Sequence, residues 1–285
     1  MHHESVSREQ SAVCRVVVRN FRRDGSRPTA YGVQALFANH FMRFFSLCPE
    51  CIHGESRIEL SDEVASYLRK NNHTKHHFSP MRVLLINGSP KENGNTYLAL
   101  SEVAKTLNTE GVETKIISIG KQAVQGCIAC GWCGRLGKCT FNDDLYYKVW
   151  RAVKDGVDGL VIGSPVYYGG PNGSLCALLD RVFYSMGNML QYKPGASVVV
   201  CRRGGASAAF DRLNKYFTIM NMPVVSSQYW NMAYGHTSGQ VALDEEGMQT
   251  MRTLGRNMAW MLKRLNVAED GHPRQERPTW TNFIK

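Results

Sequence analysis

Four cysteines near the middle of the chain have a spacing that suits a metal cluster. Cys127, Cys130, Cys133 and Cys139 are separated by two, two and five residues, with glycines between them that permit tight turns. Iron–sulfur clusters are ligated by compact motifs of this kind, because four thiolates must surround one small cluster. The sequence therefore predicts a [4Fe–4S] site, with four reduced thiols in a lid or contact loop as the alternative.

A second candidate site is the segment 88–96, which reads Gly-Ser-Pro-Lys-Glu-Asn-Gly-Asn-Thr. It follows an apolar run typical of a buried parallel strand and precedes apolar residues at helical spacing. The free amides and positive dipole end of a helix N-terminus favour an anion. Asn95 stands where a triphosphate-binding loop has lysine, and the dinucleotide fingerprint is absent. The segment predicts a site for one terminal phosphate, with a plain strand-to-helix turn as the alternative.

The 88–96 segment resembles the FMN phosphate loop of the flavodoxin-like NAD(P)H-dependent FMN reductases and iron–sulfur flavoproteins, which reads G-S-P-[RK]-x-x-G-N-T. Two later segments resemble the same family: Pro-Val-Tyr-Tyr-Gly at 165–169 matches P-V-Y-[WY]-G, and Gly-Gly at 204–205 matches a common glycine pair. An ordinary turn and solvated arginines are the alternatives for these two. The resemblance implies the following FMN-binding residues: Ser89, Lys91, Asn95, Thr96, Pro165, Val166, Tyr167, Tyr168, Gly169, Gly204 and Gly205.

The cysteine segment also resembles this family. Its iron–sulfur flavoproteins carry a compact cysteine motif after the second strand, which implies that Cys127, Cys130, Cys133 and Cys139 are metal ligands. Relatives without a cluster resemble the stretch as well, so both interpretations stay open.

The elements that must position these segments alternate along the chain from Met81 onward. The apolar patterns predict strands at 82–87, 112–119, 157–164, 196–202 and 223–228, and helices at 97–107, 144–154, 172–184, 207–220 and 244–265. Asp143 is the expected cap of the second helix. This alternation predicts a parallel sheet with helices on both faces. With the resemblance, it predicts a flavodoxin-like, doubly wound five-stranded sheet whose carboxyl edge carries the 88–96 loop.

Residues 1–80 differ in character, since they hold seven of the nine histidines and show little sustained apolar period. Cys48, Cys51 and His53 could begin a zinc site, but the remaining ligands that such a site requires are not evident. We therefore expect a poorly ordered N-terminal extension at 1–80 and an FMN-binding domain at 81–285.

The composition narrows the function classes. The net charge of +10 is scattered without a run of five basic residues, so nucleic acid is not an expected partner. No apolar run of about 18 residues is present, so no membrane span is expected. Nine cysteines and no recognisable secretory signal predict a cytoplasmic protein.

The resemblance implies an enzyme in which NAD(P)H reduces bound FMN and the flavin reduces an acceptor such as a quinone or a free flavin. The cofactor supplies this chemistry, so no side chain is assigned as a catalytic acid or base. The alternatives are an electron-transfer iron–sulfur flavoprotein fed by a ferredoxin-like partner and a flavin-binding module without turnover. Trp280, Phe283 and Ile284 near the chain end predict a tail that folds back or, by resemblance, an interface of a homodimer or homotetramer.

Overall fold

The computed structural model describes residues 80–141, 143–266, 271–277, 279 and 281. All of them belong to one compact unit that spans His76–Lys285. The predictions for residues 1–79, with the zinc hypothesis at Cys48, Cys51 and His53, lie outside the described residues. The tail residues Trp280, Phe283 and Ile284 lie outside them as well.

Five parallel strands form the central sheet in the order β2-β1-β3-β5-β6. The strands are β1 (Arg82–Asn87), β2 (Glu113–Ser118), β3 (Gly159–Tyr167), β5 (Gly195–Cys201) and β6 (Met232–Tyr234). A two-residue strand, β4 (Gly170–Pro171), pairs antiparallel with the end of β3. Since β1 lies between β2 and β3, the strand order reverses there and creates the switch point at which such sheets bind ligands. The predicted flavodoxin-like, doubly wound five-stranded sheet is confirmed.

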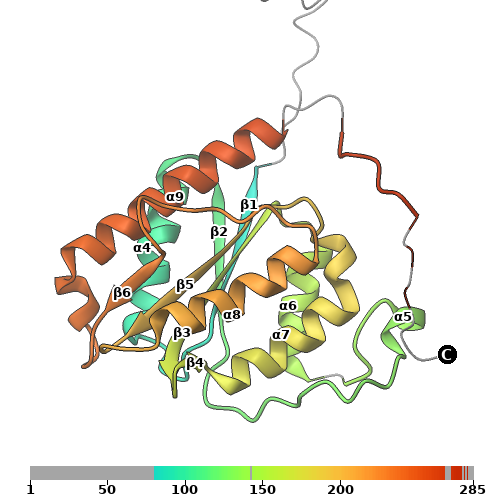
Figure 1. The fold of residues 1–285 in the computed structure, drawn as a ribbon, viewed down its shortest axis with the longest axis horizontal. Helices are drawn as coiled ribbons and strands as arrows, with labels where there is room; N and C mark the ends of the chain where they lie inside the picture. Colours follow the sequence, from blue (N-terminus) through green and yellow to red (C-terminus); the bar gives the residue numbers. More distant parts are fainter. Residues whose placement is uncertain (1–79, 142, 267–270, 278, 280, 282–285) are drawn as a thin grey trace, which may run out of the picture. The chain divides into compact units, whose positions relative to one another are not determined.

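Helices cover both faces of this sheet (Figure 1). On one face lie α4 (Asn95–Thr109) and α9 (Glu245–Asn266), and on the other lie α6 (Asp144–Lys154), α7 (Gly173–Met186) and α8 (Ala206–Ile219). The short elements are α5 (Cys133–Leu136), η2 (Gly187–Met189) and η3 (Gln240–Leu243). None of the described helices is long and apolar enough to cross a bilayer.

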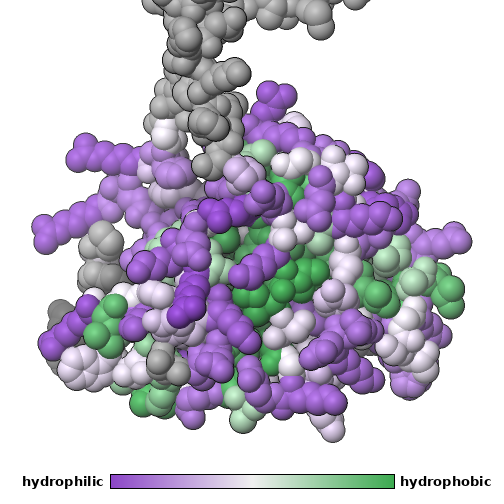
Figure 2. Space-filling view, turned by 180° about the vertical axis from the view of Figure 1, so that it is seen from behind, coloured by the Kyte–Doolittle hydropathy of each residue, from purple (hydrophilic) through white to green (hydrophobic). Residues whose placement is uncertain are grey.

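The central strands are apolar throughout because each contributes to two cores. In β1, Val83 and Leu85 pack with α4 and α9, whereas Leu84 and Ile86 pack with α6 and α7. Alternate side chains of a strand point to opposite faces, so a strand covered on both sides needs apolar residues at successive positions. Most polar side chains therefore lie in the loops and on the outer surface. Figure 2 shows one face of the molecule, which is mostly hydrophilic with an apolar area at its centre.

Most predicted elements are found close to their expected bounds. The helix predicted at 144–154 is α6, and the Asp143 side chain caps it by accepting a hydrogen bond from the Tyr146 N–H at 2.9 Å. The prediction of a strand at 223–228 was wrong. That segment makes one isolated bridge, from Val224 to Gly195, and the fifth parallel strand is β6. The described backbone hydrogen bonds between this segment and β5 are confined to Gly195, and the Ser226 carbonyl accepts a hydrogen bond from the Asn257 side chain of α9.

Candidate functional site

The first loop connects β1 to α4 and leaves backbone donors at its end. Gly94 is the N-cap of α4, and no side chain in the described part of the chain caps the helix. The Leu98 N–H is bonded within the helix, to the Gly94 carbonyl at 3.1 Å. The amides of the first turn therefore point to the end of the helix, where its positive dipole end also lies. This is the local arrangement that binds a phosphate.

The predicted loop residues divide into buried and exposed groups. Ser89 and Thr96 are buried, and the Ser89 Oγ accepts a hydrogen bond from the Lys91 N–H at 3.2 Å. Lys91 is exposed. The Asn95 amide donates to the Thr237 carbonyl at 2.9 Å and its Oδ1 accepts from the Val241 N–H at 3.3 Å. The Asn95 side chain thus holds the loop to a neighbouring segment, and its backbone N–H is the group that faces the helix terminus.

That neighbouring segment, residues 235–241 after β6, was missed by the sequence reasoning. The Ser238 hydroxyl donates to the Asn93 carbonyl at 3.1 Å. A Cβ at Gly235 would lie 2.8 Å from the Asn95 Nδ2, so the close approach requires glycine. The sequence could have indicated this segment, because a loop after the carboxyl end of a parallel strand belongs to the ligand-binding edge of the sheet. It was lost when the fifth strand was predicted too early in the chain.

The segment 165–169 forms the end of β3 and a tight hairpin with β4. Tyr168 and Gly169 both have positive φ, 50° and 76°, as a two-residue turn of type I′ requires. Tyr168 is fully exposed and Tyr167 is 46% exposed, so both rings are free for contact with a flat ligand. Pro165 and Val166 are half-buried.

The loop after β5 packs directly on this hairpin. Gly205 has a φ of 83°, and a Cβ there would lie 2.8 Å from the Gly169 Cα and 3.0 Å from the Val166 Cγ1. The residue must therefore be glycine both for its conformation and for space. Gly204 next to it is exposed. The structure thus brings together the second and third segments that the sequence predicted as one site.

Asn172, which the sequence reasoning also missed, joins the first loop to the hairpin. Its Nδ2 donates to the Gly88 carbonyl at 2.8 Å, and its N–H donates to the Ser164 Oγ at 2.9 Å. Its Oδ1 accepts from the Ser174 N–H at 2.9 Å and so caps α7. The side chain is 7% exposed. One buried amide therefore fixes the position of the first loop relative to α7.

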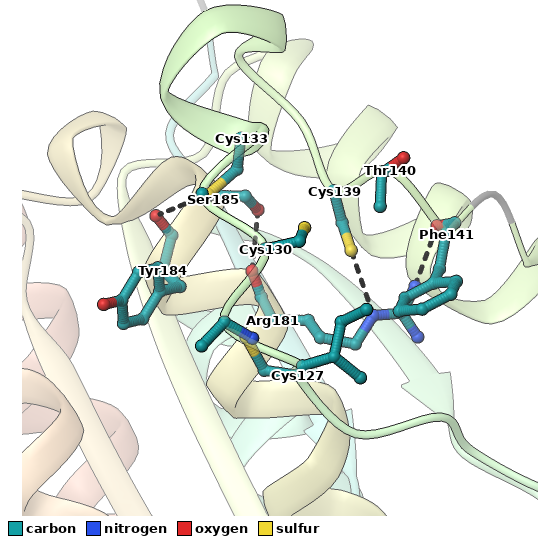
Figure 3. Close-up of a pocket in the computed structure, with 12 residues that line it drawn as sticks. Cys127, Cys130, Cys133, Cys139, Thr140, Phe141, Arg181, Tyr184 and Ser185 are labelled. Atoms are coloured by element: carbon teal, nitrogen blue, oxygen red, sulfur yellow. Dashed lines mark hydrogen bonds between the residues drawn. The ribbon is translucent and has the colours of Figure 1, made fainter.

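The four predicted cysteine ligands line one pocket beside α7 (Figure 3). Cys127 and Cys130 are exposed, Cys133 and Cys139 are half-buried, and all four thiols are free. The Ala129 N–H donates to the Cys127 Sγ at 3.4 Å, and the Arg181 Nε–H donates to the Cys139 Sγ at 3.3 Å. In the described part of the chain, no three His, Cys, Asp or Glu side chains are placed to hold a metal ion. The donor set nevertheless fits an iron–sulfur cluster, because four thiols share one pocket and N–H groups point at two of the sulfurs.

The remaining described cysteines have a different environment. Burial raises the pKa of the Cys176 and Cys201 thiols. Burial also raises the pKa of Tyr146, whose hydroxyl accepts from the Cys139 N–H at 2.8 Å and shares a hydrogen bond with Ser185. These groups stay protonated at neutral pH, so Cys176 and Cys201 have the character of packing residues and Tyr146 that of a support for the cysteine segment.

The fold and these loops define a class: a flavodoxin-like FMN protein with a phosphate-type loop at the switch point of its sheet. Residues 81–237 match the family model described as NADPH-dependent FMN reductase, and the chain belongs to that family. It is accordingly a flavin-dependent oxidoreductase with FMN as its cofactor.

Similar proteins include iron–sulfur flavoproteins. One from Methanocaldococcus jannaschii is 34% identical over 191 residues, which cover 64% of this chain and 98% of that protein. One from Methanosarcina thermophila is 28% identical over 197 residues, covering 67% of this chain and 100% of that protein. Among solved structures, RosB with a bound riboflavin-phosphate intermediate has a TM-score of 0.52 at 12% identity, covering 72% of this chain and 94% of that chain. The last similarity concerns the fold alone.

Proposed function

We propose that this protein is an iron–sulfur flavoprotein that transfers electrons between bound FMN, a [4Fe–4S] cluster and a ferredoxin-like protein. The observation that carries the proposal is the pocket shared by Cys127, Cys130, Cys133 and Cys139, on a chain that belongs to an FMN-binding family. The names of the relatives from Methanocaldococcus jannaschii and Methanosarcina thermophila support it.

In this proposal the chain's own residues hold and orient the flavin. The first-turn amides of α4, with the buried hydroxyls of Ser89 and Thr96, bind the phosphate. The segments 165–169 and 204–205 would contact the ring, since their glycines allow a close approach of backbone and the two exposed tyrosines offer flat apolar faces. When bound, FMN supplies one- and two-electron chemistry and the cluster supplies one-electron chemistry.

Helix α7 connects the two proposed sites. It begins after Asn172, which is bonded to the Gly88 carbonyl of the first loop, and its later residues Arg181, Tyr184 and Ser185 line the thiol pocket. Arg181 lies nine residues beyond Asn172, or about 14 Å along the helix axis. The separation of the two sites is therefore set by a rigid element.

The test is anaerobic purification followed by analysis of flavin, iron and acid-labile sulfide. The proposal expects one FMN and about four iron atoms per chain, with a broad absorbance at about 400 nm that dithionite removes. The variant Cys139→Ser is the matched control and should retain FMN while losing iron. A wild-type protein that carries FMN and no iron under these conditions would refute the cluster.

A second candidate function is the reduction of FMN by NAD(P)H, followed by transfer to a quinone or a free flavin. The match to the NADPH-dependent FMN reductase model and the exposed hairpin tyrosines favour it. Anaerobic mixing with NADH, NADPH or a reduced ferredoxin separates the two candidates, because only the productive donor bleaches the flavin within seconds.

The organisation of the protein is part of the proposal. We propose that residues 81–285 form the FMN-binding domain and that residues 1–80 are an extension that cofactor binding does not require. Because the four thiols must stay reduced, the reducing cytoplasm is the proposed location. The proposed assembly is a homodimer or homotetramer.

A further inference from the structure

Arg181, in the middle of α7, is a charged residue whose side chain is 0% exposed. Burial of a guanidinium group is unfavourable unless its donors are paired. The partners of Arg181 therefore indicate what the residue is for.

Among the residues that the structure describes, every hydrogen-bond partner of the guanidinium belongs to the cysteine segment or its immediate end. Nη1 donates to the Gln125 carbonyl at 3.2 Å, and Nη2 donates to the Phe141 carbonyl at 2.8 Å. Nη2 also forms an ion pair with the Asp143 carboxylate, and Nε donates to the Cys139 Sγ. Gln125 precedes the first cysteine by two residues and Phe141 follows the last by two. One side chain thus holds both ends of the segment that carries the four thiols.

Aromatic rings hold the guanidinium in its orientation. Its central carbon lies 4.8 Å from the ring centroid of Tyr146 and 5.7 Å from that of Phe141. A cation over an aromatic face gains attraction and packing together, and the planar group is less free to rotate. Asp143 is fixed in turn, because its other oxygen caps α6.

The contact with Cys139 has an electrostatic consequence. A cationic N–H that points at a ligating sulfur stabilises negative charge on it, and hydrogen bonds to cluster sulfurs are one of the means by which proteins set a cluster's reduction potential. Reduction adds negative charge, so this contact favours the reduced form.

We propose that Arg181 is a positioning residue of the cysteine site: it holds the segment 125–141 ready to bind metal and raises the reduction potential of the cluster. This inference rests on the proposed function in its second half only. The first half concerns the arrangement of the thiols, which exists without iron.

The test compares Arg181→Met and Arg181→Lys with Arg212→Met in the full-length protein. Arg212 is a matched control, because it also stacks on a tyrosine, Tyr216, and donates to its hydroxyl but has its described contacts on α7 and α8. The first measurement is Co²⁺ affinity of the iron-free proteins, followed by the thiolate-to-metal absorbance band. We expect Arg181→Met to bind Co²⁺ about ten- to a hundredfold more weakly than wild type, as loss of a supporting residue behind a ligand does. The Co²⁺ affinity of Arg181→Lys should lie between those of wild type and Arg181→Met. The Co²⁺ affinity of Arg212→Met should equal that of wild type.

The second measurement is the cluster's midpoint potential in anaerobically reconstituted protein. We expect the midpoint potential of Arg181→Lys to be lower than that of wild type. For a one-electron couple, a tenfold change in the reduction equilibrium corresponds to 59 mV. Unchanged Co²⁺ affinity in both Arg181 variants would overturn the positioning role, and an unchanged potential in Arg181→Lys would overturn the electrostatic one. A wild-type protein that binds Co²⁺ but never assembles a cluster would refute the proposed function and the electrostatic role, and the Co²⁺ affinities of the variants would still decide the positioning role. If Arg181→Met does not fold, the Co²⁺ affinity and the midpoint potential of Arg181→Lys decide between the outcomes.

Discussion

Replacing Asn172 with alanine should weaken both the fold and the proposed FMN site, because this side chain bonds the 88–96 loop to the start of α7. The change removes the hydrogen bond to the Gly88 carbonyl and the cap of α7 in one step. The backbone N–H of residue 172 still reaches the Ser164 Oγ, so the hairpin end of the contact survives. The perturbation is therefore confined to the first loop and the start of the helix.

The expected magnitude follows from these two contacts. Loss of a helix cap costs about 1 kcal/mol, and leaving a buried carbonyl without a partner costs about 1–3 kcal/mol. The free energy of unfolding should fall by about 2–4 kcal/mol in the FMN-free protein. If the released loop also loses one charge-assisted hydrogen bond to the phosphate, the FMN dissociation constant should rise by about tenfold or more.

The assay is denaturant unfolding of the FMN-free protein, with a separate fluorescence titration of FMN. Asn172→Ser is the matched control, since serine can still cap α7 but is too short to reach Gly88. The free energy of unfolding of Asn172→Ser should be about 1–3 kcal/mol below that of wild type. Its FMN affinity should fall almost as far as that of Asn172→Ala. The reasoning would be refuted by an Asn172→Ala protein within about 0.5 kcal/mol of wild type in stability and with unchanged FMN affinity.

Four further results are expected. The double variant Ser89→Ala, Thr96→Ala should bind FMN more weakly by about 1.5–3 kcal/mol for each lost hydrogen bond, as measured by titration, and full FMN content would remove the phosphate assignment. Gly205→Ala should lower the melting temperature and FMN occupancy, since its Cβ would meet Gly169 at 2.8 Å; an unchanged thermal scan would contradict this. A shortened chain that starts at Met81 should fold and carry FMN, and an insoluble product would show that the boundary is wrong. Deletion of residues 278–285 should reduce the mass seen by sedimentation, whereas a wild-type mass with full flavin would exclude that interface.

The fold was predictable where the determining contacts are local. The strand at 82–87 and the helix at 144–154 have the bounds that apolar period and the Asp143 cap predict. The fifth strand was not predictable, because β6 has three residues and pairs with β5 over Val199–Cys201 alone. So short a strand has no period to detect. The segment 223–228, which has a strand-like composition, forms a single bridge with β5, and its Ser226 carbonyl accepts from a side chain of α9.

The candidate site follows the same division. Each loop was predicted from its own residues, but the contacts that fix the loops are distant in sequence. Asn172 and Gly88 are 84 residues apart, and Asn95 and Thr237 are 142 apart. Tertiary pairs of polar groups leave no periodic signal, so a single sequence does not reveal them. The positions of the loops at the carboxyl edge of the sheet could be predicted from the sequence, and the side chains that hold them in place could not.

Helix α7 carries two of these long-range contacts, one to each proposed cofactor site. Asn172 at its start is bonded to the 88–96 loop, and Arg181 two and a half turns later is bonded to the cysteine segment. We expect a variant at one position to act on one site, because the intervening residues are packed in the core and hold the helix rigid. If the two cofactors exchange electrons, a loss of FMN in Asn172→Ala with an intact thiol site, and the reverse in Arg181→Met, would separate binding from transfer. A loss of both sites in either variant would mean that α7 is a single cooperative unit rather than a spacer between them.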